Sequence, residues 1–400
     1  MANVSSSNGL EKRPKLRFPG FDEPYRTTPL GEIASLVNRT DPKSNAPIMM
    51  LSAGNGFIMQ SEKYSRDNAG QSLKKYILLK QGELAYNHGA SKAKQFGCCY
   101  ELTEPEARIP YVYHCFKIND HEYTPFIAMA LNNAKMDKQL KRLVSSSVRM
   151  DGLLNISFED YMSVTLHLPS STEQKHIADF LKKIDERIAA QEKLLASLKK
   201  YKRGVVKAIL SKRIRFADDR GNYYPEWSEC TLQEVVDFLD GQRKPLESAD
   251  RAKRQGKYPY YGASGIIDYI DDYIFDEPLL LLGEDGANII NRSFPLCFIA
   301  TGKYWVNNHA HVMRPRKGQN IKFICELLES LDYTRYNTGT AQPKLNQEKC
   351  RQIALHLPTY EEQCHIAEFL SLVEQKSIHA QTELDSLLRT KNALMQQLFI

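Results

Sequence analysis

Two long stretches of this chain carry apolar residues at alternating steps of four and three, which is typical of a helix that buries one stripe against a partner helix. The same spacing recurs 189 residues further along the chain. We therefore predict two long helices, over 170–213 and 358–400. The seam positions of the first are Ile177, Leu181, Ile184, Ile188, Gln191, Leu195, Leu198, Lys202, Val205 and Ile209. Those of the second are Ile366, Leu370, Val373, Ser377, Ala380, Leu384, Leu387, Lys391, Leu394 and Leu398.

The start of each helix is nearly a copy of the other. Residues 166–181 and 355–370 are identical at eleven of sixteen positions and share Pro-x-x-x-Glu-Gln-x-His-Ile-Ala-x-Phe-Leu. Ser170 and Thr359 each precede a glutamate by three residues, which predicts a capping box at both starts. Each helix would extend about 50 Å at 1.5 Å per residue. The alternative, two separate surface helices, fits poorly with a strict seam of this length.

The segments before the two helices predict two globular modules, 1–169 and 214–357. Both open with a similar phrase, Leu16-Arg17-Phe18 and Ile214-Arg215-Phe216, and then diverge. Because the first helix leaves module one and the second begins where module two ends, paired helices must run antiparallel. The predicted class is α/β, with two globular modules separated by an antiparallel two-helix coiled coil and related by a pseudo-twofold internal repeat.

Short strand patterns and polar loops fill the second module, as in an α/β domain. The strand patterns lie at 257–267, 279–282, 298–300 and 305–312, a helical pattern at 321–331 and a polar loop at 337–346. In the first module, residues 81–88 and the basic loop 91–94 are the nearest parallels.

Composition and charge narrow the class of protein. The 400 residues, 42% hydrophobic and 26% charged, suffice for two cores. The N-terminal stretch is polar, so we expect no signal peptide. The chain has no long apolar run, so we expect no membrane span. Eight cysteines without a C-x-x-C pair predict reduced, mostly buried thiols and a cytoplasmic protein. The net charge is +6, but segment 170–213 carries +7 and segment 358–400 carries −3. This asymmetry favours a polyanionic partner, pairing of the two helices, or both.

Motifs for catalysis and metal binding are missing, so we predict no catalytic residue, metal ligand or cofactor in this chain. Gly302-Lys303 is followed by Tyr304, which excludes a phosphate-binding P-loop. Glu173-Gln174-Lys175 imitates part of a nuclease site, yet the second copy has Cys364 in place of the lysine. His309-x-His311 has ligand-like spacing on one strand face, and we favour hydrogen-bonded structural histidines there.

The chain resembles the specificity (S) subunits of type I restriction-modification systems. The resemblance rests on the duplicated helix start, on Tyr-Tyr-Gly-Ala-Ser-Gly at 260–265, on Asn-Asn-His-Ala-His at 307–311 and on the loop 339–346. It implies two target recognition domains, each of which reads one half of a bipartite, asymmetric DNA site. It also implies that the helices set the spacer and dock two modification subunits, with two restriction subunits in the full complex. S-adenosylmethionine, ATP and Mg would belong to those partners, and adenine methylation and DNA cleavage would be their chemistry.

Tyr, Asn, Gln, Ser, Arg and Lys in the loops are the side chains that contact phosphates and base edges, although any solvated loop is also polar. The predicted DNA-contacting residues of module one are Tyr86, Asn87, His88, Ser91, Lys92 and Lys94. Those of module two are Gln242, Arg243, Lys244, Lys257, Tyr260, Tyr261, Ser264, Lys303, Asn307, Asn308, His309, His311, Thr338, Gln342 and Lys344. The predicted spacer and partner-docking residues are Glu173, Gln174, Ile177, Leu181, Ile184, Glu362, Gln363, Ile366, Leu370 and Val373. The basic run Lys199, Lys200, Lys202, Arg203 and Lys207 would contact spacer phosphates or pair with the acidic second helix.

Two other classes of protein remain open from the sequence. One is an enzyme, a fused restriction–modification polypeptide or an unrecognised nuclease, although cofactor motifs are missing. The other is a coiled-coil adaptor that joins proteins without touching DNA. Salt-dependent DNA binding would separate the adaptor from a DNA reader, because phosphate contacts release counterions.

Overall fold

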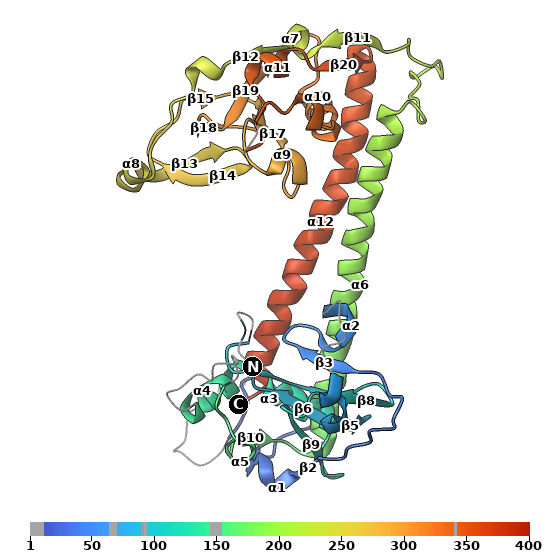
Figure 1. Ribbon diagram of the computed structural model, residues 1–400, viewed down its shortest axis with the longest axis vertical. Helices are drawn as coiled ribbons and strands as arrows, with labels where there is room; N and C mark the ends of the chain where they lie inside the picture. The colour runs from blue at the N-terminus through green and yellow to red at the C-terminus, as the bar shows by residue number, and fades with distance from the viewer. Residues whose placement is uncertain (1–11, 64–69, 90, 92–93, 145–153, 340–341) are drawn as a thin grey trace. The chain divides into compact units, whose positions relative to one another are not determined.

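A computed structural model gives the fold and describes residues 12–63, 70–89, 91, 94–144, 154–339 and 342–400. The chain divides into two compact units (Figure 1). The first unit comprises residues 1–191 with 383–400, and the second comprises 192–382. Each unit therefore contains one globular part and a portion of both long helices. Among the described residues, every helix is too short or too polar to span a bilayer.

The two predicted helices are α6 (Ser171–Leu210) and α12 (Tyr360–Leu398). All twenty seam positions are buried or half-buried, as a shared apolar stripe requires. In the first unit, Asp185 pairs with Lys391 at 2.5 Å and Arg187 with Glu383 at 2.9 Å. From one pair to the next, the residue number rises along α6 and falls along α12, so the helices run antiparallel there. The predicted antiparallel coiled coil is confirmed.

Lys202 pairs with Glu374 across the same two helices in the second unit, at 3.5 Å. Lys202 and Lys391 occupy matching seam positions, and Asp185 and Glu374 occupy matching positions beside the seam, because each pair is 189 residues apart. The internal repeat thus preserves a lysine–carboxylate pair as well as the apolar seam. Lys202 also contacts Glu326 of the same unit at 2.6 Å. Of the two roles left open for the basic run, Lys202 takes the pairing one.

The globular part of the first unit is built from antiparallel strand pairs around a central four-stranded sheet. That sheet has the order β2 (Ala34–Leu36), β9 (His114–Ile118), β6 (Leu84–Asn87), β7 (Cys98–Glu101). The other strand pairs are β1 (Arg26–Pro29) with β10 (Thr165–Leu168), β3 (Met49–Ser52) with β4 (Gly56–Met59) and β5 (Ile77–Lys80) with β8 (Glu106–Ile109). The shorter helices are α1 (Leu30–Ile33), α2 (Gln60–Lys63), η1 (Gly70–Lys75), α3 (Thr124–Leu131), α4 (Ala134–Leu143) and α5 (Phe158–Met162).

The second unit has the same frame with a larger addition. Its central sheet has the order β12 (Val236–Phe238), β19 (Ala310–Pro315), β16 (Leu279–Gly283), β17 (Cys297–Ala300). A further sheet has the order β14 (Gly265–Ile270), β13 (Gln255–Gly262), β18 (Lys303–Val306), β15 (Phe275–Asp276), and β11 (Ser228–Thr231) pairs with β20 (Ala354–Leu357). The shorter helices are α7 (Leu232–Val235), η2 (Asp240–Gln242), α8 (Ser248–Lys253), α9 (Asn288–Asn291), α10 (Ile321–Ser330), η3 (Thr334–Tyr336) and α11 (Gln347–Arg351).

The frame of both modules is repeated even where their sequences diverge. A strand, a one-turn helix and another strand open each module, as β1–α1–β2 and as β11–α7–β12. The last strand before each long helix, β10 or β20, pairs antiparallel with the first strand of its module. The mixed fold and the internal repeat predicted from the helix starts are confirmed.

The Glu-Gln pair of the duplicated helix start ties each long helix to its module. Gln174 accepts a hydrogen bond from the backbone N–H of Tyr123 at 2.9 Å and donates to the Pro169 carbonyl at 3.0 Å. Gln363 does the same with Asn320 at 2.9 Å and Pro358 at 3.1 Å. Tyr123 and Asn320 are the N-cap residues of α3 and α10, whose first N–H groups lack helical partners. Each glutamine therefore binds the first turn of a long helix to the start of a neighbouring helix.

The glutamates of the two copies have different surroundings. Glu173 accepts two hydrogen bonds from the Arg17 guanidinium, at 2.9 and 2.8 Å. The matching Arg215 instead donates to Glu226 at 2.7 Å. Burial raises the pKa of Glu362, and its Oε2 has no hydrogen-bond partner among the described residues. One of the two hydrogen bonds of a capping box forms in both copies. The Ser170 hydroxyl accepts from the Glu173 N–H, and the Thr359 hydroxyl accepts from the Glu362 N–H, each at 3.4 Å.

Replacing Gln363 by alanine should destabilise the chain by about 2–4 kcal/mol. The substitution leaves the Asn320 N–H and the Pro358 carbonyl buried without their partner, and each such loss costs roughly 1–3 kcal/mol. Urea unfolding of the full chain measures the change. Gln375→Ala is the matched control, because Gln375 lies exposed on the same helix. Equal midpoints for the two variants would contradict the tying role of Gln363.

Candidate nucleic-acid interface

Four loops of the second unit meet beside the central sheet. They are η2 with the residues after it, the turn 284–286 after β16, the turn 307–309 before β19 and the loop that ends at Leu345. Strand pairing places Gly283 opposite Ala310, so the turns at 284 and 309 are neighbours. The Glu284 N–H donates to the His309 carbonyl at 2.8 Å, and the Leu345 N–H donates to the Glu284 carbonyl at 2.7 Å. Backbone hydrogen bonds therefore join three of these loops.

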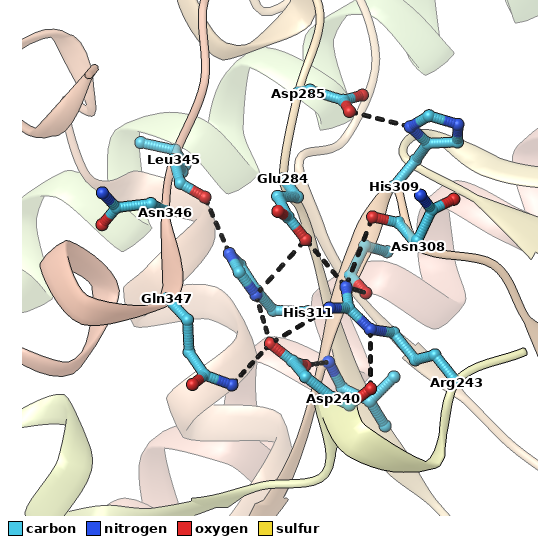
Figure 2. Close-up of polar contacts among 12 residues, drawn as sticks. Asp240, Arg243, Glu284, Asp285, Asn308, His309, His311, Leu345, Asn346 and Gln347 are labelled. Atoms are coloured by element: carbon cyan, nitrogen blue, oxygen red, sulfur yellow. Dashed lines mark hydrogen bonds and ion pairs between the residues drawn. The ribbon is translucent and has the colours of Figure 1, made fainter. Parts of the chain in front are cut away.

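The side chain of His311 lies at the centre of this junction and is 1% exposed (Figure 2). Its Nδ1 lies 2.7 Å from Asp240 Oδ2, and its Nε2 lies 2.8 Å from the Leu345 carbonyl. Both partners only accept hydrogen bonds, so both ring nitrogens must donate and the ring is an imidazolium. Burial alone would lower the pKa of His311. The hydrogen bonds and charges of Asp240 and Cys350 together outweigh burial, and the pKa rises from 6.5 to about 10.

Asp240 and Arg243 attach the η2 loop to the same centre. Asp240 accepts hydrogen bonds from the Val312 N–H at 2.8 Å and from Gln347 Nε2 at 2.7 Å. Burial opposes ionisation of Asp240, but His311, the Val312 N–H and the charge of Arg243 keep its pKa below its ordinary value. Arg243 donates to the Ala310 carbonyl and to Glu284 Oε2, both at 2.8 Å. Two cations and two carboxylates thus form one interior cluster that holds the loops together (Figure 2).

Two further basic side chains reach solvent at the edge of this cluster. His309 and Lys344 are both 51% exposed along their side chains. Asp285 Oδ2 lies 2.7 Å from His309 Nδ1, and Glu284 Oε1 lies 3.5 Å from Lys344 Nζ. Each exposed basic group therefore faces a carboxylate of the same turn.

Comparison with known proteins places this architecture in a family. The model of the type I restriction modification DNA specificity domain matches residues 74–200 and 224–389. The chain belongs to this family. One copy of the domain begins in each module and extends into the long helix that follows it.

Curated relatives of this chain carry specificity-subunit names. A Haemophilus influenzae protein named as a type I restriction enzyme specificity subunit is 34% identical over 146 residues, 36% of this chain and 36% of its own length. The Escherichia coli EcoprrI specificity subunit is 28% identical over 146 residues, covering 36% of this chain and 35% of its own. The chain therefore matches about a third of the length of these curated relatives.

Solved structures support the fold across nearly the whole chain. The type I restriction-modification S subunit from M. genitalium has a TM-score of 0.61 at 16% identity, covering 97% of this chain and 99% of that one. A chain from a study of complex assembly in the type I R-M system has a TM-score of 0.55 at 15% identity, covering 96% and 98%. At these identities the likeness concerns the fold alone.

Within the second specificity domain, the predicted DNA-contacting residues separate into surface and interior groups. The exposed ones are Gln242, Lys244, Lys257, Ser264, Lys303, Asn308, His309, Thr338, Gln342 and Lys344. Arg243 and Tyr261 are half-buried, and Tyr260, Asn307 and His311 are buried. The buried group makes internal contacts: the Tyr260 hydroxyl, for example, accepts from the Leu246 N–H at 2.9 Å.

His309 and His311 do not share a strand face as predicted. The turn 307–309 ends one residue before β19, so His309 faces solvent while His311 points into the core. The preference for a hydrogen-bonded structural histidine describes the placement of His311 well. The spacing suited to a common ligand is lost because only one of the two residues belongs to the strand.

In the first specificity domain, the predicted contacts are mostly internal. Tyr86 is buried, stacks on Tyr161 at 3.8 Å and donates to the Phe96 carbonyl at 2.6 Å. His88 is buried between the Leu154 and Val112 carbonyls, at 2.8 and 2.9 Å. Asn87 is half-buried and accepts from the Gly89 N–H at 2.9 Å, and Lys94 donates to the Asn132 carbonyl at 2.7 Å. Ser91 is exposed, and Lys92 lies outside the described residues.

The predicted docking residues are turned inward within this chain. Glu173, Gln174, Ile177, Leu181, Glu362, Gln363, Ile366, Leu370 and Val373 are buried, and Ile184 is half-buried. They hold each module onto the helices, so their surface is already occupied. The exposed large apolar residues of the helices are instead Phe180, Leu194, Tyr201, Tyr360, Leu372, Ile378 and Leu388, and Lys199, Lys200, Arg203 and Lys207 are exposed as well.

Sequence reasoning missed Asp240, Glu284 and Asp285, which organise the junction. Asp240 is 71 residues from His311 and 107 from Gln347. No local spacing connects segments so far apart, and single acidic residues beside glycine are common in turns.

Replacing His311 by leucine should lower the free energy of unfolding by about 3 kcal/mol at pH 7, because Asp240 would lose its buried partner. The folded pKa is raised, so the stabilisation by His311 is complete below pH 6.5 and is lost as the pH rises through about 10. The difference between wild type and variant should therefore shrink between pH 7 and 10.5, as measured by urea unfolding.

The control is His356→Leu, which removes an exposed histidine 3.0 Å from Glu229 in the same unit. An exposed pair of this kind contributes less than about 1 kcal/mol. A difference for His311→Leu that stays constant across this pH range would show that the ring is not charged in the folded protein.

Proposed function

We propose that this chain is the non-catalytic DNA-specificity subunit of a type I restriction-modification complex in the cytoplasm. The observation that carries the proposal is the double match to the DNA specificity domain, at 74–200 and 224–389. A chain that carries two such domains suits a bipartite target, with one half-site for each. Because the two modules share a frame but differ in their loops, the two half-sites would differ in sequence.

The long helices supply the second part of the proposal. A seam buried along the full length of α6 and α12 makes a stiff pair, and stiffness is what a spacer between two DNA readers requires. The pair would set the number of unread base pairs and dock two modification subunits. The exposed apolar side chains on the outer faces, such as Leu194 and Ile378, suit that docking. In the full complex, two restriction subunits would join.

The chemistry of methylation and cleavage would lie in the partner subunits. They would bring S-adenosylmethionine, ATP and Mg, and adenine would be the methylated base. The part played by this chain is to bind double-stranded DNA through loops such as those around His309 and Lys344. Base edges in the major groove would supply sequence recognition and phosphates would supply affinity.

Exchanging residues 26–168 for the equivalent module of another family member should change one half-site of the methylated sequence and leave the other unchanged. The cut points lie at the ends of β1 and β10, which pair with each other and close the module. Sequencing of methylated genomic DNA from cells that express the complex gives the site. A change in both halves, or in neither, would contradict independent reading by the two modules.

Deleting seven residues from each long helix should shorten the spacer by about three base pairs. Removal of 190–196 from α6 and of 379–385 from α12 keeps the heptad phase and shortens the pair by about 10 Å. The same sequencing measures the spacer, and both half-sites should stay the same. A matched deletion of seven residues from α6 alone should abolish methylation, because it breaks the register of the seam. An unchanged spacer in the double deletion would contradict the proposal that the length of the helix pair sets the spacer.

A further inference from the structure

The pair formed by Asp285 and His309 has the geometry of a preorganised hydrogen-bonding group. The backbone N–H of His309 donates to Asn307 Oδ1 at 2.8 Å, and its ring Nδ1 lies 2.7 Å from Asp285 Oδ2. Asp285 is itself held, because its turn bonds to Lys344 through a β-bridge and to Pro343 through the Gly286 N–H at 3.0 Å. His309 is thus held at its backbone and at its ring, and Figure 2 shows the ring pointing away from the interior cluster.

The carboxylate decides which nitrogen of His309 carries the proton. A carboxylate only accepts hydrogen bonds, so Nδ1 must donate to Asp285. In the neutral ring, Nε2 then bears a lone pair and acts as an acceptor. No hydrogen bond to Nε2 is formed by the residues that the structure describes, and the side chain is 51% exposed. The surface therefore presents one directed acceptor at the edge of the loop junction.

The charge around this acceptor is balanced, which distinguishes it from a phosphate site. Asp240, Glu284 and Asp285 face Arg243, His311 and Lys344 within the same junction. Phosphate binding relies on an excess of positive charge, which releases counterions from DNA. A neutral surface with a fixed acceptor suits the edge of a base instead. The bases that present a donor in the major groove are adenine, through N6, and cytosine, through N4.

We propose that Asp285 is a positioning residue for sequence recognition, and that His309 Nε2 accepts a hydrogen bond from the exocyclic amino group of an adenine or cytosine. The inference rests on the proposed function, since it requires this unit to read a half-site. It adds to that function one specific contact: at one position of the half-site, the protein accepts a hydrogen bond from the base. Asp285 acts through His309, whose orientation and proton position it sets.

Asp285→Asn tests the proposal, because an asparagine amide can donate to Nδ1 and so move the ring proton to Nε2. The same exchange of carboxylate for amide beside a histidine gives the wrong tautomer in serine proteases. Nε2 would then donate, and the base preferred at one position should change from adenine or cytosine to guanine or thymine, by about tenfold. Selection from randomised duplexes by the complex of this chain with its modification subunits measures the preference.

A second variant and a matched control separate recognition from stability. His309→Ala should make the same position indifferent to the base and leave every other position unchanged. Asp276→Asn is the control, because Asp276 is a carboxylate of the same unit that also faces a basic side chain, Lys303 Nζ at 3.8 Å. The affected position should lie in the half-site that exchange of residues 26–168 does not alter. Thermal melting of each variant should stay close to that of wild type.

Two results would overturn the inference. An unchanged base preference for both Asp285→Asn and His309→Ala would show that the pair reads nothing. An affinity that rises for all duplexes alike, with a steeper dependence on salt, would show that Asp285 repels phosphate instead. Failure of the proposed function has a different outcome, since the wild-type complex would then select no bipartite sequence at all.

Discussion

The apolar seam between α6 and α12 is the interaction on which both units depend. Each helix has a single apolar stripe, so neither is stable unless its stripe is covered. The seam also continues into the two cores: Ile177 and Leu398 belong to the core of the first unit, and Val205 and Ile366 to that of the second. Because the same side chains serve the coiled coil and the modules, loss of the seam would expose both cores to water.

The internal repeat preserves the same frame of strands and helices in each module, while the sequences and loops within the frame differ. Gln174 and Gln363 make the same bonds in the two units, and Lys391 and Lys202 pair with matching carboxylates. Away from the helices, the second unit adds a four-stranded sheet that carries β13 to β15 and β18. A rigid frame with different loops is the arrangement that lets one chain present two different binding surfaces.

The sequence predicted the helices well because a heptad pattern is local and survives any packing of the modules. The resemblance to specificity subunits led to the prediction of Glu173 and Gln174 as docking residues. Their partners are internal, because the glutamine bonds a second helix more than 40 residues away in the chain. The junction around His311 was beyond prediction for the same reason. Its charges come from separate segments, and only folding of β16 beside β19 brings them together.

The interior cluster at this junction shows why charged residues are present where apolar ones would pack. Burying Asp240, Arg243, Glu284 and His311 requires their desolvation, which apolar side chains would not. Apolar contacts, however, have no preferred direction and would hold four irregular loops only loosely. Hydrogen bonds, in contrast, have a preferred length and direction. Arg243 lies 2.8 Å from the Ala310 carbonyl, and His311 lies 2.8 Å from the Leu345 carbonyl. The loops therefore keep one conformation, and the exposed groups at their edge keep one orientation towards whatever they bind.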